Sequence, residues 1–436
     1  MTMDTAPATT LFAPASGFGR AAVAVIRISG PEAGPVLAAL GGPLPLPRRL
    51  SLRTLRDPAD GTILDRALVA FFPGPDTYSG EDMAELHLHG GLAVRAGVLA
   101  ALGRHPGCRA AGTGEFTRRA VLNGRMDLAE AEGVADLIDA ETEGQRRQAL
   151  RQLDGALSRQ VAAWREEAIA CLAGAEAALD FSDEGDVDEA SLDAALMGRA
   201  QHLREAIAAA LADGRRGERL REGFWVVLAG EPNAGKSTLL NALAQRDAAI
   251  VSDIPGTTRD AIEVRLDLDG LPVVLVDTAG LRETNEAVEA EGIRRSRARM
   301  AEADLVLALV PPGGVAPEIG GSPALTVRTK ADLLPDMPEG LAVSARTGAG
   351  LPALLDTLRA QVEAGLGQGD ALITRARHRD ALERCLGHLD RLLGGGPPEL
   401  MAEDLRLAVR ALGEIGGHVG VEDILDRLFA GFCIGK

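Results

Sequence analysis

The chain has 436 residues, of which 46 are Lys or Arg and 63 are Asp or Glu, and its formal net charge is −17. Its 46% hydrophobic and 25% charged residues are typical of a globular protein of several domains and exclude a disordered chain. The acidic balance argues against a protein that coats nucleic acid. No apolar run reaches the roughly 18 residues of a membrane span, and the four scattered cysteines form no metal-binding pair. We therefore expect a cytoplasmic protein with no membrane partner.

Short apolar runs separated by Gly and Pro fill the first 120 residues. Ala22–Ile28, Ala67–Phe72 and Ala84–Leu88 predict strands of a small α+β domain. The segment Gly17-Phe-Gly-Arg20 precedes a predicted strand and follows none, which argues against a dinucleotide-binding turn.

The run Glu85-Leu-His-Leu-His89 alternates polar and apolar residues. In a strand, its polar side chains share one face and its leucines share the other. A Glu on such a face is a suitable partner for a ligand that carries N–H donors. A metal site at His87 and His89 lacks an obvious third ligand, so we expect both to belong to a polar surface.

From about Asp127 the pattern becomes helical. One apolar stripe, with steps of three or four residues, runs through Leu150, Leu153, Leu157, Val161, Trp164, Ala168, Cys171, Ala175 and Ala178. The acidic segment Asp183–Glu189 lacks the Gly and the terminal Glu of an EF-hand loop, so we expect a solvated loop there. Arg215–Glu222 is predicted to be a charged linker.

Strands and helices then alternate, which is typical of a parallel sheet. The predicted strands are Phe224–Ala229, Ile262–Leu268, Val273–Val276, Leu305–Val310, Ala324–Val327 and Leu341–Val343. Asp269-Gly270 predicts a hairpin between the second and third of them. Helical sequence returns after about Asp370. We therefore predict a multidomain α/β protein with an N-terminal α+β domain at 1–120, a helical domain at 121–218 and 366–436, and an α/β domain inserted at 219–365.

A phosphate-binding loop is the strongest motif in the chain. Gly230-Glu-Pro-Asn-Ala-Gly-Lys-Ser237 follows a predicted strand and opens a predicted helix, Ser237–Leu243, as the motif requires. Backbone amides of such a loop surround the phosphates at a helix N-terminus. Lys236 is expected to neutralise the β and γ oxygens, and the hydroxyl of Ser237 to bind Mg²⁺.

Three further segments at strand ends identify the nucleotide as GTP. Asp277-Thr-Ala-Gly280 places an Asp near Mg²⁺ and a Gly amide near the γ-phosphate. In Thr329-Lys-Ala-Asp332, the Asp can accept both N–H groups of the guanine edge, a pair that adenine lacks. Ser344-Ala-Arg346 can supply a backbone N–H to the guanine carbonyl. Thr329 stands where this guanine motif usually has Asn, so we expect weaker guanine binding with the selectivity of Asp332 retained.

A switch segment, Gly256–Asp260, lies between the loop helix and the next strand, and Thr258 is our candidate for the second Mg²⁺ hydroxyl. The residue after Gly280 is Leu281, which cannot orient water as the Gln of Ras-like enzymes does. We therefore expect a monovalent cation beside Asn233 and a carboxylate farther along the chain. The carboxylate candidates that spacing leaves open are Glu283, Glu286, Glu289 and Glu291.

These motifs together resemble the MnmE (TrmE) family of tRNA-modification GTPases. The resemblance runs nearly from end to end, through Gly230–Ser237, Asp253-Ile-Pro-Gly-Thr-Thr-Arg-Asp260, Asp277-Thr-Ala-Gly-Leu-Arg282 and the terminal Phe432-Cys-Ile-Gly-Lys436. It implies a Ras-like G domain inserted in a helical domain, behind a folate-binding N-terminal domain that forms a homodimer. It also implies a flavoprotein partner, MnmG (GidA), and modification of carbon 5 of the wobble uridine U34 of certain tRNAs with a one-carbon unit from 5-formyl-tetrahydrofolate.

The resemblance also assigns residues. It implies K⁺ ligands at Asn233, Ser252, Ile254 and Thr257, Mg²⁺ ligands at Ser237 and Thr258, a catalytic carboxylate at Glu289, and folate contacts at Arg27, Glu85, Arg125 and Lys436. The predicted GTP contacts are Asn233, Ala234, Gly235, Lys236, Ser237, Thr238, Ser252, Asp253, Ile254, Pro255, Gly256, Thr257, Thr258, Asp277, Thr278, Ala279, Gly280, Thr329, Lys330, Ala331, Asp332, Ser344, Ala345 and Arg346. K⁺ is expected to draw two G domains together for hydrolysis. Cys433 lies in apolar company and is not assigned to catalysis.

The alternative is a ribosome-assembly GTPase, a binding switch with a similar G domain. That class predicts a basic RNA-binding module or a second G domain, and this acidic sequence contains neither. A membrane iron-transport GTPase is excluded because the sequence has no span.

Overall fold

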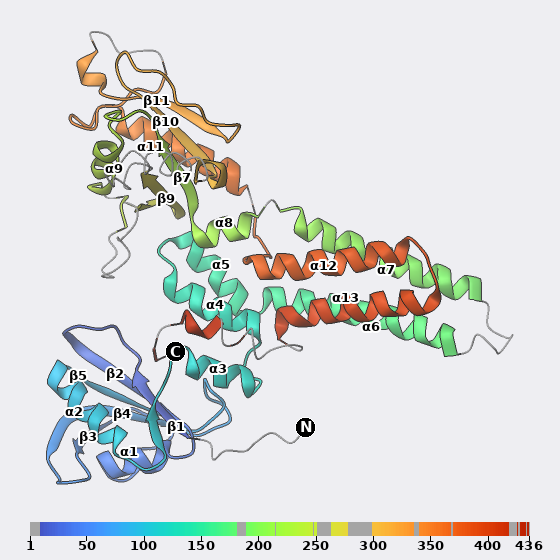
Figure 1. Cartoon of the computed structure of the whole chain (residues 1–436). Helices are drawn as coiled ribbons and strands as arrows, with labels where there is room; N and C mark the ends of the chain where they lie inside the picture. Colours follow the sequence, from blue (N-terminus) through green and yellow to red (C-terminus); the bar gives the residue numbers. More distant parts are fainter. Residues whose placement is uncertain are drawn as a thin grey trace, which may run out of the picture. The chain divides into compact units, whose positions relative to one another are not determined.

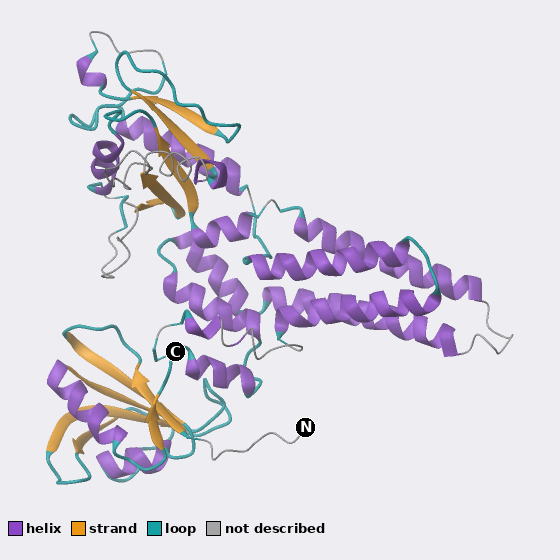
Figure 2. Cartoon of the chain, in the orientation of Figure 1, coloured by secondary structure: helices purple, strands orange, loops and turns teal. Residues whose placement is uncertain are grey.

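The computed structural model describes residues 9–180, 189–213, 215–246, 248–250, 263–277, 299–334, 340–367, 369–417, 425, 428–432 and 434–435. The chain divides into two compact units, one of residues 1–135 with 416–436 and one of residues 136–415. Figure 2 shows that strands occur in both and that most helices belong to the second. No helix in the described part of the chain is long and apolar enough to cross a membrane.

The first unit contains a six-stranded sheet in the order β3-β4-β5-β2-β1-β6, antiparallel except for the β1–β6 pair (Figure 1). Its elements are β1 Thr10–Pro14, β2 Ala21–Ser29, α1 Ala33–Gly41, β3 Ser51–Arg56, β4 Ile63–Phe72, β5 Met83–Gly90, α2 Leu92–Gly103, β6 Cys108–Ala110, α3 Glu115–Leu122 and the first part of α4 Leu128–Asp139, within which the division falls. Apolar residues of β2, β4 and β5 pack against α1 and α2 and form the core. The three strands expected here are confirmed.

The alternation expected in β5 is also present. Leu86 and Leu88 are buried, Glu85 and His87 are half-buried, and His89 is exposed. One expectation about this unit was wrong. Gly17–Arg20 does follow a strand, β1, which is too short and too varied in sequence to stand out as an alternating pattern. The strand after the turn, β2, is antiparallel to β1, so the segment is still no dinucleotide-binding turn.

The C-terminal residues belong to the same compact unit as the first 135 residues. Leu425, Phe429 and Phe432 pack against Leu128 and Ala131 in one apolar cluster. Ile434 forms a bridge with Thr113. Gly435 lies so close to β1 that a Cβ on it would come within 1.9 Å of a backbone oxygen there. The last described residues are therefore packed against the N-terminal sheet.

The second unit combines a helical bundle with a five-stranded sheet in the order β11-β10-β7-β9-β8. Its elements are α5 Glu143–Leu153, α6 Ala156–Asp180, α7 Glu189–Leu211, α8 Arg216–Glu222, β7 Phe224–Ala229, α9 Lys236–Ala244, β8 Glu263–Leu268, β9 Leu271–Asp277, β10 Leu305–Val310, β11 Ala324–Arg328, the 3₁₀ turn Ala331–Leu333, α11 Leu351–Leu366, α12 Ala376–Leu393 and α13 Pro398–Gly416. Long helices α6, α7, α12 and α13 run alongside one another (Figure 1). All sheet pairs are parallel except the β8–β9 hairpin, whose Asp269-Gly270 turn is confirmed.

Three expectations about this unit need correction. The apolar stripe from Leu150 belongs to two helices, because Gly155 adopts φ = 75° and ends the first. The charged linker is a helix, α8, in which Glu218 is buried and paired with arginines. Residues 341–343 form a single bridge to β11 and not a strand, since the chain turns away directly after them. The acidic segment at 183–188 lies outside the described residues.

The β8–β9 hairpin rests on the helical part of the same unit. The backbone N–H of Gly144, at the start of α5, donates to the carbonyl of Gly270 at 3.0 Å. The guanidinium of Arg265 on β8 is paired with Glu141 at 3.1 Å. The strand that ends at Asp277 is thus supported from outside the sheet.

Two segments connect the sheet to the helical bundle: helix α8 and the chain after residue 370. These two segments lie side by side. Arg379 is paired with Glu218 at 2.6 Å and with Asp213 at 2.9 Å. The contact is close because Gly217 has no side chain: a Cβ there would lie 2.1 Å from the carbonyl oxygen of Ile373.

We expect Gly217→Ala to lower the free energy of unfolding by about 1–3 kcal/mol, the usual cost of overpacking a closed contact. The nearest obstructing atom is a backbone oxygen and cannot rotate away. Gly198→Ala is the matched control, because a Cβ on that helical glycine would meet no atom within 4 Å and the substitution gains helix propensity. Thermal unfolding measures both. Equal melting temperatures for the two variants would contradict this account of the connection.

Candidate nucleotide-binding site

The loop between β7 and α9 has the backbone shape of a phosphate cradle. Gly235, at the helix N-terminus, adopts φ = 96°, and Asn233 is left-handed with φ = 68°. Gly230 passes so close to β10 that a Cβ would meet the carbonyl oxygen of Leu309 at 2.7 Å. These conformations leave the first N–H groups of α9 directed at the loop, where an anion is stabilised.

The ammonium of Lys236 lies inside this loop. Its Nζ donates to the carbonyl of Gly230 at 2.7 Å and to that of Glu231 at 3.1 Å, and the residue is 8% exposed. The charge is held within the cradle by neutral oxygens, which phosphate oxygens can replace with stronger, charge-assisted bonds.

A hydroxyl and a carboxylate meet at the next strand end. Ser237 Oγ donates to Asp277 Oδ2 at 2.7 Å, and Asp277, the last residue of β9, is 1% exposed. The sheet places them together because β7 and β9 are parallel neighbours with Leu228 opposite Asp277. Two hard oxygen donors beside a phosphate loop fit Mg²⁺, which prefers such ligands together with phosphate and water.

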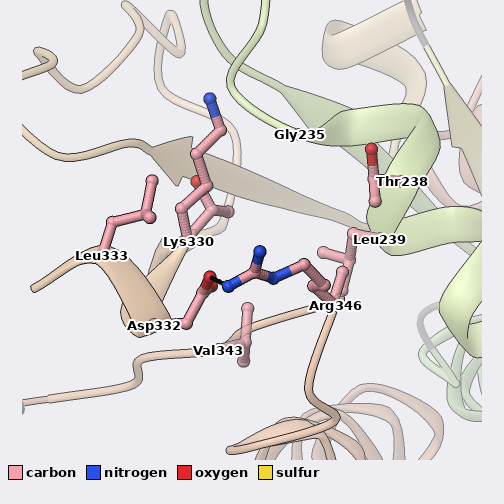
Figure 3. A pocket seen from close by; sticks show the side chains of 10 residues that line it. Gly235, Thr238, Leu239, Lys330, Asp332, Leu333, Val343 and Arg346 are labelled. Atoms are coloured by element: carbon pink, nitrogen blue, oxygen red, sulfur yellow. Dashed lines mark ion pairs between the residues drawn. The ribbon is translucent and has the colours of Figure 1, made fainter.

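A pocket of about 220 Å³ lies beside the loop (Figure 3). Its lining consists of the predicted residues Gly235, Thr238, Thr329, Lys330, Asp332, Ala345 and Arg346 together with Leu239, Leu333 and Val343. Sequence reasoning missed the three apolar residues, although each is next to or near a recognised motif. Their side chains can offer apolar contact to a ligand, and the polar ones can provide specificity.

Asp332 is the acidic side chain among the residues that line this pocket. Its Oδ1 accepts from the hydroxyl of Ser344 at 2.6 Å. Its Oδ2 is 2.9 Å from Nη2 of Arg346, an ion pair that Figure 3 marks with a dashed line. The hydrogen bond from Ser344 and the nearby charge of Arg346 hold the pKa of Asp332 below its ordinary value. The carboxylate is therefore ionised at neutral pH, and its two oxygens can accept two N–H donors from a ligand.

A second polar group occupies the open face of the N-terminal sheet. Arg27 on β2 donates to Glu85 on β5 at 3.2 and 3.3 Å, and Nε2 of His87 lies 3.4 Å from the same carboxylate. The guanidinium of Arg27 also lies over the rings of Tyr78, at 5.4 Å, and Phe116, at 6.0 Å. Sequence reasoning missed both aromatic residues, which no local motif marks.

The structure brings together some predicted residues and not others. Arg27 and Glu85 are in contact. Arg125 instead forms an ion pair with the loop residue Asp76, with 3.6 Å between Nη1 and Oδ1. Among the described residues, no three His, Cys, Asp or Glu side chains gather as a metal site. The predicted residues outside the described part of the chain are Ser252, Asp253, Ile254, Pro255, Gly256, Thr257, Thr258, Thr278, Ala279, Gly280, Glu289 and Lys436.

Comparison with known proteins gives a consistent result. Residues 10–125 match the family model of the GTP-binding protein TrmE N-terminus, and residues 128–433 match that of the MnmE helical domain. The tRNA modification GTPase MnmE of Methylobacterium radiotolerans is 77% identical over 98% of this chain and 99% of its own, and that of Methylorubrum populi is 74% identical over 98% of each. The chain belongs to the MnmE family of tRNA modification GTPases. Among solved structures, Aquifex aeolicus Era bound to GDP·AlF₄⁻ is 22% identical, with a TM-score of 0.26, over 38% of this chain and 66% of that one.

The two MnmE-family models meet close to the boundary between the compact units. The first ends at residue 125 and the second begins at residue 128, near the division at residue 135. The second model also spans the five-stranded sheet, because in this MnmE-family chain that sheet is inserted between α8 and α11. The expected multidomain α/β architecture is confirmed, and family membership favours tRNA modification over ribosome assembly.

Proposed function

We propose that this chain couples GTP hydrolysis to modification of the wobble uridine U34 of certain tRNAs. Membership of the family makes it a GTP hydrolase that acts in tRNA modification. The finer proposal adds a flavoprotein partner of the MnmG type and a one-carbon unit from 5-formyl-tetrahydrofolate. The observation that carries it is the coexistence, in one chain, of a phosphate loop with a guanine-reading Asp332 and of an Arg27–Glu85 pair on an open sheet face. Because the substrate is tRNA, we place this work in the cytoplasm.

The residues have distinct roles in hydrolysis. Lys236 exchanges two backbone carbonyls for the β and γ oxygens of GTP, and Ser237 with Asp277 provides the oxygen donors for Mg²⁺. We assign the remaining metal hydroxyl to Thr258 and the catalytic carboxylate to Glu289. The other GTP contacts are proposed as predicted above, as are the four-part division at 1–120, 121–218, 219–365 and 366–436 and the homodimer.

The product of the reaction tests the proposal. Deleting the gene and analysing tRNA by mass spectrometry should show loss of the modified wobble uridine, and restoring the wild-type chain should return it. An unchanged profile of modified nucleosides would contradict the proposal. Accumulation of immature ribosomal particles with normal tRNA would favour the ribosome-assembly alternative.

We expect GTP hydrolysis to be at least about tenfold faster in K⁺ than in Na⁺ at equal ionic strength. Asn233 supports this, because it is an exposed, left-handed residue of the phosphate loop and its side chain carries an amide oxygen, a group that can bind a cation. Ser252, Ile254 and Thr257 are the other proposed ligands. Phosphate release measures the rates, with GDP affinity in both salts as the control. Equal rates would remove the proposed role of Asn233.

The open face of the N-terminal sheet supports the proposed homodimer. Leu52 on β3 lies opposite Leu68 on β4, which lies opposite His87 on β5, which in turn lies opposite Val25 on β2. Leu52 is 67% exposed and Leu68 is also exposed. A row of mostly apolar side chains on a sheet face is suited to burial against a second copy.

We expect Glu85→Gln to weaken binding of 5-formyl-tetrahydrofolate about tenfold or more. The variant removes the charge that Arg27 neutralises and one acceptor for the donors of the pterin. Isothermal titration with the folate measures the effect, and GTP titration of the same variant should be unchanged. Arg125 and Lys436 are the other proposed contacts. Folate affinity equal to that of the wild type would place the ligand elsewhere.

A further inference from the structure

The guanine motif is physically tied to the phosphate loop through one side chain. The hydroxyl of Thr329 donates to the backbone carbonyl of Ala234 at 2.6 Å, and both residues are buried, Thr329 being 4% exposed. The backbone N–H of Thr329 donates in turn to the carbonyl of Val310 at 3.0 Å. Thr329 therefore connects the end of β10 to the loop.

This bond fixes the orientation of the peptide group between Ala234 and Gly235. Left-handed residues, Asn233 and Gly235, flank Ala234 on either side. A peptide group is planar and trans, so its C=O and the following N–H point in opposite directions. Holding the carbonyl of Ala234 toward Thr329 thus holds the N–H of Gly235 away from Thr329. That N–H immediately precedes Lys236 in the phosphate cradle.

The same bond prevents the hydroxyl of Thr329 from donating to guanine. A hydroxyl has one hydrogen, and here it is donated to a backbone carbonyl. Guanine presents acceptors at O6 and N7, and Thr329 has no hydrogen left for either. The branched side chain also has few χ1 alternatives, so the hydroxyl stays in place.

We propose that Thr329 is a positioning residue that orients the phosphate loop through Ala234, while Asp332 alone among these side chains recognises the base. The side chain of the usual Asn at this position has both a donor and an acceptor. The one hydroxyl hydrogen of Thr329 is instead donated to the carbonyl of Ala234 in the loop. The inference rests on the proposed GTP site, and it concerns how that site divides its work between base and phosphate.

A matched pair of variants tests the proposal. Thr329→Val keeps the branched shape and removes the donor, and Thr329→Ser keeps the donor and removes a methyl group. We expect Thr329→Val to weaken GTP and GDP about tenfold and to raise KM more than it lowers kcat. Thr329→Ser should stay within about threefold of the wild type. Fluorescent-nucleotide titration measures these affinities.

Two further ligands separate positioning from base recognition. Guanosine, which has no phosphate, should bind Thr329→Val and the wild type within about twofold of each other in competition with fluorescent GDP. The ratio of GTP to ITP affinity should also be unchanged, because ITP lacks only the amine that Asp332 reads. If guanosine weakens as much as GTP, or if Val and Ser behave alike, the proposal is overturned. Thr329→Ala provides the same test if Thr329→Val does not fold, and a wild-type protein that fails to bind GTP would instead refute the proposed function.

Discussion

Replacing Lys236 by Gln should reduce GTP hydrolysis at least about 100-fold. Its ammonium lies within the phosphate loop, 2.7 Å from the carbonyl oxygen of Gly230, and is almost fully buried. Removing it leaves the β and γ oxygens of GTP without their nearest cation and leaves two loop carbonyls without their donor. Phosphate release under saturating GTP measures the effect.

The charge alone should not be sufficient at this position. We expect Lys236→Arg to retain less than about a tenth of the activity, because a planar guanidinium is wider than an ammonium and the site is closed. The chain has 43 Arg and only three Lys, so the presence of Lys at this position agrees with a requirement for a compact cationic group. Glu231→Gln is the control, since it changes an exposed loop side chain by one charge and leaves the carbonyl that Lys236 contacts. Full activity of the Arg variant would contradict the size argument.

Asp332→Asn should weaken GTP binding about 100-fold and make XTP the preferred nucleotide. A carboxylate accepts two hydrogen bonds, as the guanine edge requires, whereas an amide accepts one and donates one. Xanthine carries an oxygen where guanine carries the 2-amine, so it matches the amide. Competition between fluorescent GTP and each unlabelled triphosphate measures the exchange of preference.

Arg346→Gln is the matched control for this second prediction. Arg346 is paired with the same carboxylate, but its side chain is 77% exposed, and such pairs contribute little free energy in water. We expect this variant to bind GTP equally well or up to about threefold more tightly, because it removes a competitor for Asp332 without changing the acceptor. If Arg346→Gln lost as much affinity as Asp332→Asn, the carboxylate would not be the group that reads guanine.

Local patterns determined much of the fold. The limits of β7 and β10 were predictable because parallel strands buried on both faces appear as continuous apolar runs. The Asp269-Gly270 turn was predictable because Asp-Gly between two apolar runs is a hairpin signal. Expectations failed where a tertiary contact decided the outcome. Helix α8 is rich in charged residues and resembles a linker, yet burial of Glu218 between arginines makes it a helix.

The residues of the candidate sites also fall into two groups: those that a local motif predicted and those that only tertiary contacts reveal. Lys236, Ser237, Asp277 and Asp332 were identified from motifs because their chemistry depends on short spacings along the chain. Tyr78 and Phe116, which lie against Arg27, belong to no such spacing. Nothing in the sequence placed them near that guanidinium, because the contacts join residues about 50 to 90 positions apart.

The sequence by itself determined the class of nucleotide, the family, and most of the strands, because each of these depends on residues that are neighbours along the chain. Only the tertiary structure decided which groups contact one another: that Thr329 bonds to Ala234, that Ser237 reaches Asp277, and that Gly435 packs on the N-terminal sheet. The physical reason is that a hydrogen bond depends on a distance of about 3 Å in space. That distance is set by the packing of whole strands and helices, which no local pattern contains.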